Sequence, residues 1–153
     1  MPLWSSSLRK LWRRPWSDWW LLVRAMALTV VVRAGLSLYS LDRVTRSLRR
    51  IAQWLPREKC PTPAYRERAA WAANAVGYRF LPERPCLTQA LVLQYLLFRQ
   101  GDEASQLCIG VTKHEGELKA HAWVERNGRV LIGGTVSPHK YERLRNLEEK
   151  IGS

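Results

Sequence analysis

The pattern of apolar positions along the chain changes from a helical to an alternating period near residue 101. Before this point apolar residues recur every three or four positions in four segments, which predicts helices over residues 17–40, 42–55, 64–78 and 86–100. After it, alternation predicts strands over residues 106–113, 117–125 and 130–136. Asn127 and Gly128 predict a tight hairpin turn, because both residues accept a positive φ. Helices followed by an antiparallel sheet indicate the α+β class.

Further local predictions follow from the same pattern. Ser17 or Asp18 is expected to cap the first helix, and Gly101 to end the fourth. The charged, amphipathic segment 139–152 predicts a C-terminal helix. Residues 56–63 hold three prolines and mark the predicted boundary between a helical region, 1–59, and a domain over residues 60–153.

Positive charge is concentrated in the first of these regions. The chain of 153 residues carries a net charge of +12, and residues 1–59, with 12 Lys/Arg and 3 Asp/Glu, account for +9. Six of the eight tryptophans also lie before residue 60. A basic, Trp-rich segment suits an anionic membrane surface or an acidic partner. Since no nucleic-acid-binding motif accompanies it, nucleic acid is not an expected partner.

The first predicted helix is apolar but is interrupted by Arg24 and Arg33. Its longest uncharged run, residues 25–32, is far shorter than the roughly 20 residues that a membrane span needs. We therefore expect a helix packed on the domain, with a helix lying in a membrane interface as the alternative, and no signal peptide. The three cysteines form no CxxC or Cys/His metal spacing, which predicts a reduced, cytoplasmic protein without a metal.

Cys86 opens the fourth predicted helix, which is apolar nearly all round and should be central and buried. A free cysteine is most often a small buried apolar residue. A thiol at a helix N-terminus, however, lies beside unpaired amide N–H groups and the positive end of the helix dipole, which favour the reactive thiolate. Cys86 is therefore a candidate nucleophile.

His121 lies 35 residues later, in the middle of a predicted strand. A lone histidine in a strand is often structural, but a nucleophilic cysteine needs a base, and a histidine on an adjacent sheet can provide it. Trp123 shares its strand face and either fills the core or shields the pair from water. The remaining residues of these types are expected to be incidental: His114 in a turn, His139 at a helix start, Cys108 in the core and Cys60 in the proline-rich segment.

Together, the segments CLTQALVLQYLLFRQG, LCIGVTK and HAWVERNGRVLIGG resemble the leader peptidases of lasso peptide biosynthesis. These belong to the transglutaminase-like branch of the papain-type cysteine enzymes, and the resemblance covers residues 64–134. It implies a buried, Cys-bearing helix packed on an antiparallel sheet, with Cys86 as nucleophile and His121 as base. The backbone N–H groups of Cys86 and Leu87 would hold the oxyanion, and no cofactor is implied.

In one place the sequence departs from this family. Many members carry an acidic residue about a dozen positions after the histidine, where this chain has Gly133 and Gly134. An uninterrupted hairpin would set Gly134 opposite His121. Glu125 shares the strand face of His121 but is expected to face solvent. The group that orients His121 is therefore open: a backbone carbonyl, Thr135, an acid from elsewhere, or none.

The resemblance also implies a substrate, the junction of leader and core in a ribosomally made lasso precursor peptide. Residues 1–59 show no run of alternating strands that could capture a leader by strand addition, so a separate leader-binding protein is expected. The lasso cyclase is a further expected partner, and residues 1–59 could also contact a membrane. Two alternatives remain open: a transglutaminase-type acyl transferase and a non-catalytic scaffold.

Overall fold

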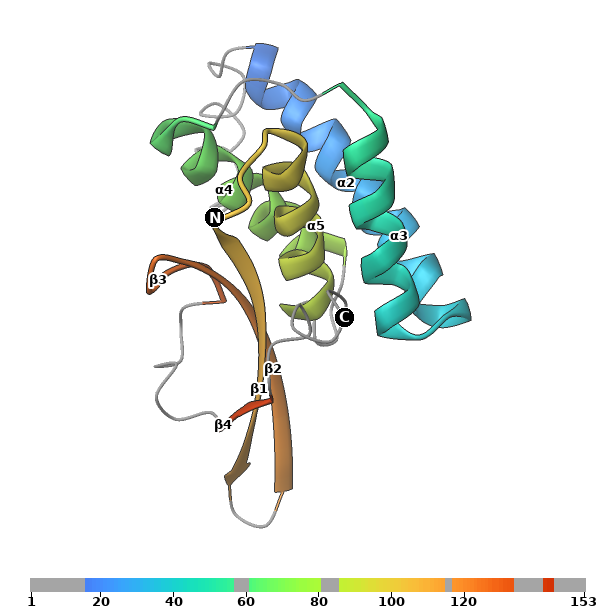
Figure 1. The fold of residues 1–153 in the computed structure, drawn as a ribbon, viewed down its shortest axis with the longest axis vertical. Helices are drawn as coiled ribbons and strands as arrows, with labels where there is room; N and C mark the ends of the chain where they lie inside the picture. The colour runs from blue at the N-terminus through green and yellow to red at the C-terminus, as the bar shows by residue number, and fades with distance from the viewer. Residues whose placement is uncertain (1–15, 57–60, 81–85, 115–116, 134–141, 145–153) are drawn as a thin grey trace, which may run out of the picture.

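Figure 1 shows a helical layer packed against one end of an antiparallel sheet. The structure is a computed structural model that describes residues 16–56, 61–80, 86–114, 117–133 and 142–144. The described elements are the helices α2 (Trp16–Leu38), α3 (Leu41–Trp54), α4 (Pro63–Phe80) and α5 (Cys86–Arg99), followed by the strands β1 (Ser105–His114), β2 (Glu117–Arg126), β3 (Arg129–Ile132) and β4 (Glu142–Leu144). The predicted α+β class is confirmed.

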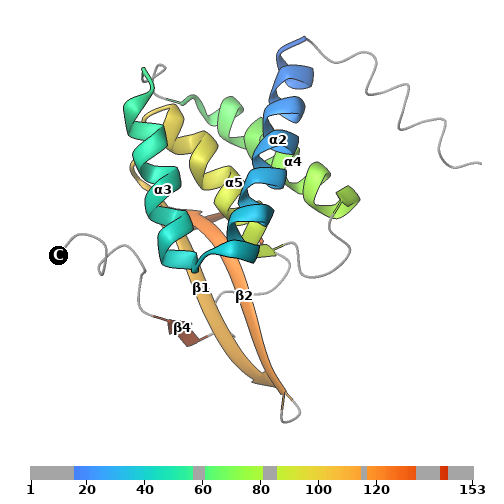
Figure 2. The same cartoon turned by 90° about the vertical axis from the view of Figure 1, so that its right-hand side faces the viewer.

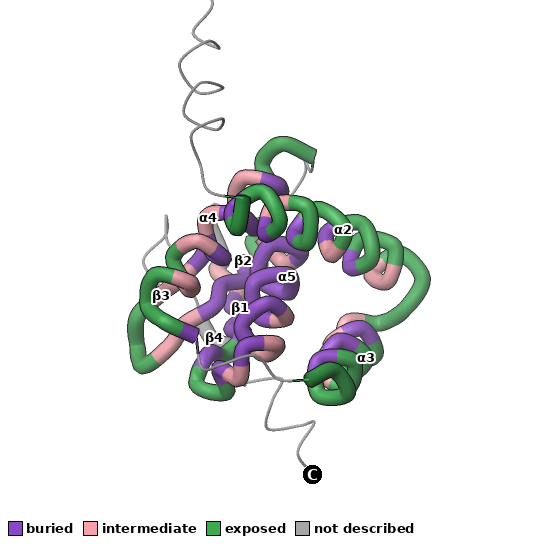
Figure 3. Tube along the Cα trace, turned by 90° about the horizontal axis from the view of Figure 1, so that it is seen from above, coloured by how far each residue is buried: buried purple, intermediate pink, exposed green. Residues whose placement is uncertain are grey.

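Helix α5 is the centre of the fold. Nine of its fourteen residues are buried, and it contacts α2, α3, α4 and three strands of the sheet. Viewed from above, α5 lies inside the layer while α2 and α3 lie at its outside (Figure 3). A helix that is apolar nearly all round is stable only when it is covered on every side, so the prediction of a central, buried helix is confirmed.

The helices that cover α5 use small or aliphatic residues at the contact. Helix α4 presents alanines and Gly77, where a Cβ atom would lie 2.3 Å from the side chain of Gln89 on α5. Helices α2 and α3 contribute Leu21, Ala25, Val32, Val44 and Leu48 to the same hydrophobic core. The helices before residue 60 therefore share one core with the elements after it.

The sheet has the strand order β3-β2-β1-β4. Residues Leu107, Ala122, Val124 and Ile132 belong to the core that α5 fills. Because side chains alternate along a strand, Cys108, His121 and Trp123 lie on the other face of β1 and β2. Cys108 pairs with Trp123 and is buried, as predicted.

The hairpin between β2 and β3 confirms the predicted turn and corrects the predicted register. Asn127 and Gly128 both have a positive φ. The expected pairing holds at Glu125 with Val130 but shifts at a bulge, so that Val124 pairs with Ile132. The extra residue turns Ile132 into the core, which an uninterrupted register would not do. The uninterrupted register expected from the sequence is therefore broken between Glu125 and Val124, and residues 134–136 lie outside the described part.

Other boundaries also differ from the predictions. Residues 142–144, predicted as helix, form β4, because their backbone pairs with the outer edge of β1 from Ile109 to Val111. The rest of the predicted 139–152 helix lies outside the described residues. His114 is the last residue of β1 rather than part of a turn.

The predicted cap of the first helix is wrong. Ser17 and Asp18 lie inside α2, which begins at Trp16. Asp18 is buried and binds the guanidinium of Arg68 on α4, with 3.3 Å between Oδ1 and Nη1. The carboxylate thus joins two helices instead of capping one.

The C-terminal end of α5 is fixed by its own backbone. Gly101 has a φ of 82° and donates its N–H to the carbonyl of Phe98, while Asp102 donates its N–H to that of Leu97. This is a Schellman motif, in which the left-handed glycine satisfies the last carbonyls of the helix. The predicted stop at Gly101 is confirmed, and the motif turns Asp102 inward.

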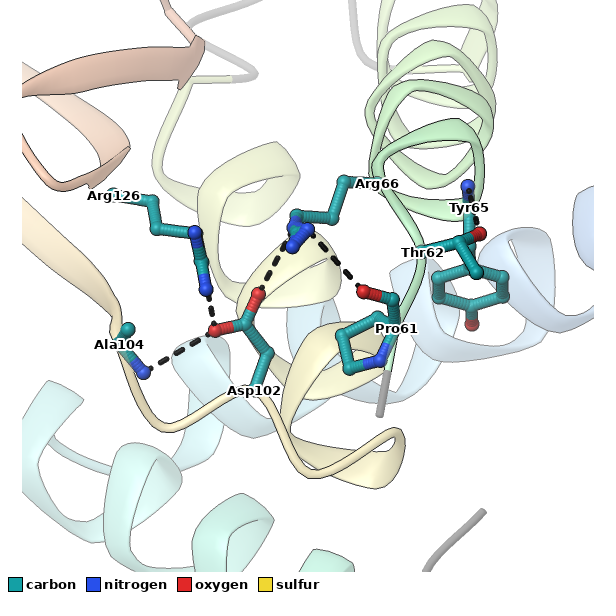
Figure 4. A network of polar contacts seen from close by, with 7 residues as sticks. All are labelled: Pro61, Thr62, Tyr65, Arg66, Asp102, Ala104 and Arg126. Carbon is teal, nitrogen blue, oxygen red and sulfur yellow. Dashed lines mark hydrogen bonds and ion pairs between the residues drawn. The ribbon is translucent and has the colours of Figure 1, made fainter. Parts of the chain in front are cut away.

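The carboxylate of Asp102 connects three parts of the fold (Figure 4). Its Oδ1 accepts hydrogen bonds from the backbone N–H of Ala104 and from Nε of Arg126 on β2, each at 3.2 Å. Its Oδ2 lies 3.4 Å from Nε of Arg66 on α4. Since Asp102 is almost fully buried, this single negative charge holds the helical layer and the sheet together next to the end of α5.

We expect Asp102→Asn to lower the free energy of unfolding by about 3 kcal/mol, because the change leaves two partly buried guanidinium groups without their negative partner. Urea unfolding followed by circular dichroism measures it. The matched control is Glu117→Gln, which removes an exposed carboxylate at the start of β2 and should change stability by less than about 0.5 kcal/mol. Equal stability of Asp102→Asn and the wild type would contradict this role.

Candidate active site

Cys86 is the first residue of α5 and has a free, half-buried thiol. The N–H groups at the start of a helix have no acceptor one turn earlier in the same helix. The N–H groups of Cys86 and Leu87 belong to this set, so they are candidate hydrogen-bond donors to an oxyanion next to the thiol.

His121 is oriented by the backbone. Its Nε2 lies 2.8 Å from the carbonyl oxygen of Gly133. A carbonyl can only accept a hydrogen bond, so Nε2 carries the hydrogen and Nδ1 is the acceptor nitrogen of the neutral ring. Among the orienting groups left open by the sequence, the described structure thus holds a backbone carbonyl in place. Thr135 lies outside the described residues.

Gly133 can present this carbonyl because it has no side chain. Its φ is 87°, in the left-handed region that L-residues rarely adopt. A Cβ atom at this position would lie 2.8 Å from Cβ of Trp123 and 2.9 Å from the carbonyl oxygen of Ala122. Of the two glycines that stand where the resemblance leads us to expect an acid, Gly133 thus occupies a position at which this backbone excludes a side chain.

Trp123 flanks the imidazole of His121. The two rings are stacked, with 6.2 Å between their centroids and 20° between their planes. Trp123 is almost fully buried, and its indole Nε1–H donates to Oε2 of Glu125 at 3.2 Å. Trp123 therefore packs in the interior and also contacts the ring of His121. Glu125, expected to face solvent, is instead half-buried and holds the indole.

Cys86 and His121 lie on adjoining elements, since α5 contacts β2. The end of α5 that carries Cys86 points toward the part of the β1–β2 ribbon that extends beyond the helices (Figures 1 and 2). His121 lies on the sheet face opposite to that of Ala122 and Val124, which pack in the core with α5. The contacts that the structure describes for the imidazole of His121 are those with Gly133 and Trp123.

The structure does not describe the side chains of three other candidates from the sequence. Cys60 and His139 lie outside the described residues, and the side chain of His114 is not among those described. No three His, Cys, Asp or Glu side chains in the described segments are grouped as metal ligands. A cleft of about 240 Å³ is lined by residues that include neither candidate, namely Pro63, Arg66, Glu67, Ala70, Arg126, Arg129, Val130 and Leu131.

Cys86 opens a buried helix and His121 lies on the antiparallel sheet that packs against this helix, within an α+β fold. The family model described as "Transglutaminase-like superfamily" matches residues 30–146, and the chain belongs to this family. The match begins inside α2 and crosses the predicted boundary after residue 59. Comparisons with curated proteins and with solved structures gave no match.

We expect Gly133→Ala to displace the carbonyl from His121, because the new methyl group meets Trp123 and the backbone of Ala122. Long-range ¹⁵N–¹H NMR of the histidine rings should show the Nε2–H tautomer of His121 in the wild type and a mixture in the variant. The free energy of unfolding should fall by about 2 kcal/mol or more.

Gly128→Ala is the matched control for this change. Gly128 also has a positive φ, but a Cβ atom there meets nothing within 4 Å. It should show the strain of the backbone alone and leave the tautomer of His121 unchanged. An unchanged tautomer in Gly133→Ala would show that the carbonyl does not orient the ring.

Proposed function

We propose that this member of the transglutaminase-like superfamily is a thiol peptidase in which Cys86 attacks a peptide carbonyl and His121 is the base. Family membership supports cysteine peptidase or acyl-transfer chemistry in general. The observation that supports His121 as the base is its hydrogen bond to the carbonyl of Gly133. With Nε2 as the donor, Nδ1 is the acceptor nitrogen that a general base needs.

In the first half of the reaction, Nδ1 of His121 takes the proton of the Cys86 thiol as the sulfur attacks the carbonyl carbon. The carbonyl oxygen becomes an oxyanion, which the N–H groups of Cys86 and Leu87 stabilise. As the intermediate collapses, the imidazolium gives its proton to the leaving amine. The products of this half are a thioester on Cys86 and a free amine.

In the second half, Nδ1 takes a proton from water, whose oxygen attacks the thioester. Collapse of the second intermediate releases a carboxylic acid and returns the thiol. Throughout both halves the carbonyl of Gly133 keeps Nε2–H in place, so that the same ring nitrogen moves the proton each time.

The substrate that we propose is a lasso precursor peptide, cut at the junction of leader and core. The support for this finer assignment is the resemblance of segments 86–101, 107–113 and 121–134 to the lasso leader peptidases. A separate protein would present the leader, since residues 16–38 and 41–54 form helices that offer no strand for addition. The freed core would pass to a cyclase.

An acyl transferase is the second candidate, and it shares the thioester. The two activities differ only in whether water or an amine resolves that intermediate. Family membership supports both. The alternative of a non-catalytic scaffold predicts no reaction at all.

We expect cleavage of a lasso precursor peptide, mixed with a separate leader-binding protein, to require Cys86. Mass spectrometry should find two fragments with the wild type and none with Cys86→Ala, while Cys60→Ser, the matched cysteine control, should cleave normally. In oxygen-18 water the leader fragment should gain the label, because water resolves the thioester. An amide-linked product without label would indicate the acyl transferase, and cleavage by Cys86→Ala would refute the nucleophile.

The pairing of Cys86 with His121 has its own test. In mildly acidic solution, where an isolated thiol is mostly protonated, alkylation of Cys86 by iodoacetamide should slow by about tenfold in His121→Ala. The control His114→Ala removes another histidine from the same sheet and should leave the rate unchanged. Equal rates in wild type and His121→Ala would show that the two residues do not interact.

A further inference from the structure

Helix α2 has two apolar faces, of which the fold covers one. The covered face packs against α4 and α5 through Leu21, Ala25, Thr29 and Val32. At 100° per residue, the opposite side of the helix carries large apolar side chains that are highly exposed: Trp16 91%, Trp20 61%, Val23 47%, Val30 65%, Val31 59% and Leu38 74%. Figure 3 shows this side at the outside of the helical layer.

The charges of α2 are arranged around this exposed face. Its acidic residue, Asp18, is buried and bound to Arg68. Its basic residues, Arg24 and Arg33, are both exposed and lie nine residues apart, roughly half a turn around the axis. They therefore flank the apolar face on its two sides. The guanidinium of Arg24 also lies over the ring of Trp20, 5.6 Å from its centroid.

This arrangement matches the chemistry of an anionic lipid surface. Apolar side chains between flanking arginines enter the boundary of headgroups and acyl chains, while the guanidinium groups reach lipid phosphates. Trp16, Trp19 and Trp20 gather at one end of the helix, and tryptophan is the residue that favours this boundary. The +9 net charge of residues 1–59 adds attraction to negatively charged lipids.

We propose that α2 binds the protein to the surface of a bilayer that contains anionic lipids, with the helix lying parallel to the surface. Helix α2 is long and apolar enough to cross a membrane by length and composition. A crossing would withdraw its inner face from α4 and α5 and bury the ion pair of Asp18 with Arg68 in lipid. Lying flat keeps both intact. The proposal does not depend on the catalytic assignment.

The test is sedimentation of the full-length protein with vesicles of phosphatidylcholine, alone or mixed with phosphatidylglycerol. We expect binding to the mixed vesicles only, reversed by high salt. Val23→Glu combined with Val30→Glu should weaken binding by about tenfold or more. Arg24→Gln combined with Arg33→Gln should weaken it through the loss of charge alone. Melting curves of each variant verify that the fold is kept.

The matched control is Tyr78→Glu combined with Phe80→Glu, which adds the same charge at exposed positions of α4 and should bind within about twofold of the wild type. Absence of vesicle binding by the wild type, or equal binding to neutral vesicles, would overturn the proposal. So would a dimer that Val23→Glu with Val30→Glu dissociates, since the face would then cover a second copy. Resistance to salt and alkaline extraction would indicate a span instead.

Discussion

The need to cover α5 on every side determines the rest of this structure. Its residues are apolar nearly all round, so the helix gains stability only if every face leaves water. Three helices and one face of the sheet meet this need, and the close approach of α4 depends on alanines and on Gly77 against Gln89. The helices α2 and α3 are therefore part of the same folding unit as the candidate site, whatever further contacts they make.

The two ends of α5 differ: its C-terminal end is fixed by buried polar contacts, and its N-terminal end carries the half-buried Cys86. At the C-terminal end, the glycine turn and the buried carboxylate of Asp102 fix the helix to α4 and β2. At the other end, about 20 Å away by helix rise, Cys86 remains half-buried with the first amide N–H groups around it. A helix held firmly at one end and packed along its length keeps its first residue in a constant place, which is the condition for a positioned nucleophile.

What the sequence could predict is what local pattern controls. The helical period predicted α2 to α5, and Asn127-Gly128 predicted the hairpin turn. The predicted start of α5 singled out Cys86 as a candidate nucleophile. The bulge before Ile132, the strand at 142–144 and the role of Asp102 depend on partners far along the chain, so no local signal marks them. The group that orients His121 illustrates both what the sequence predicts and what only the structure shows. The sequence showed glycine where an acid was expected, but only the backbone of Gly133 showed which group faces His121.

A carbonyl and a carboxylate orient a histidine equally well but do not act equally on its charge. Both accept the hydrogen of Nε2 and so select the same tautomer. A carboxylate also attracts the imidazolium that forms when His121 takes the thiol proton, while a neutral carbonyl offers only a dipole. The ring of Trp123 is stacked beside that of His121, with 6.2 Å between the two centroids. The hydrogen bond to Gly133 therefore fixes the orientation of the His121 ring without the negative charge that an acid would supply.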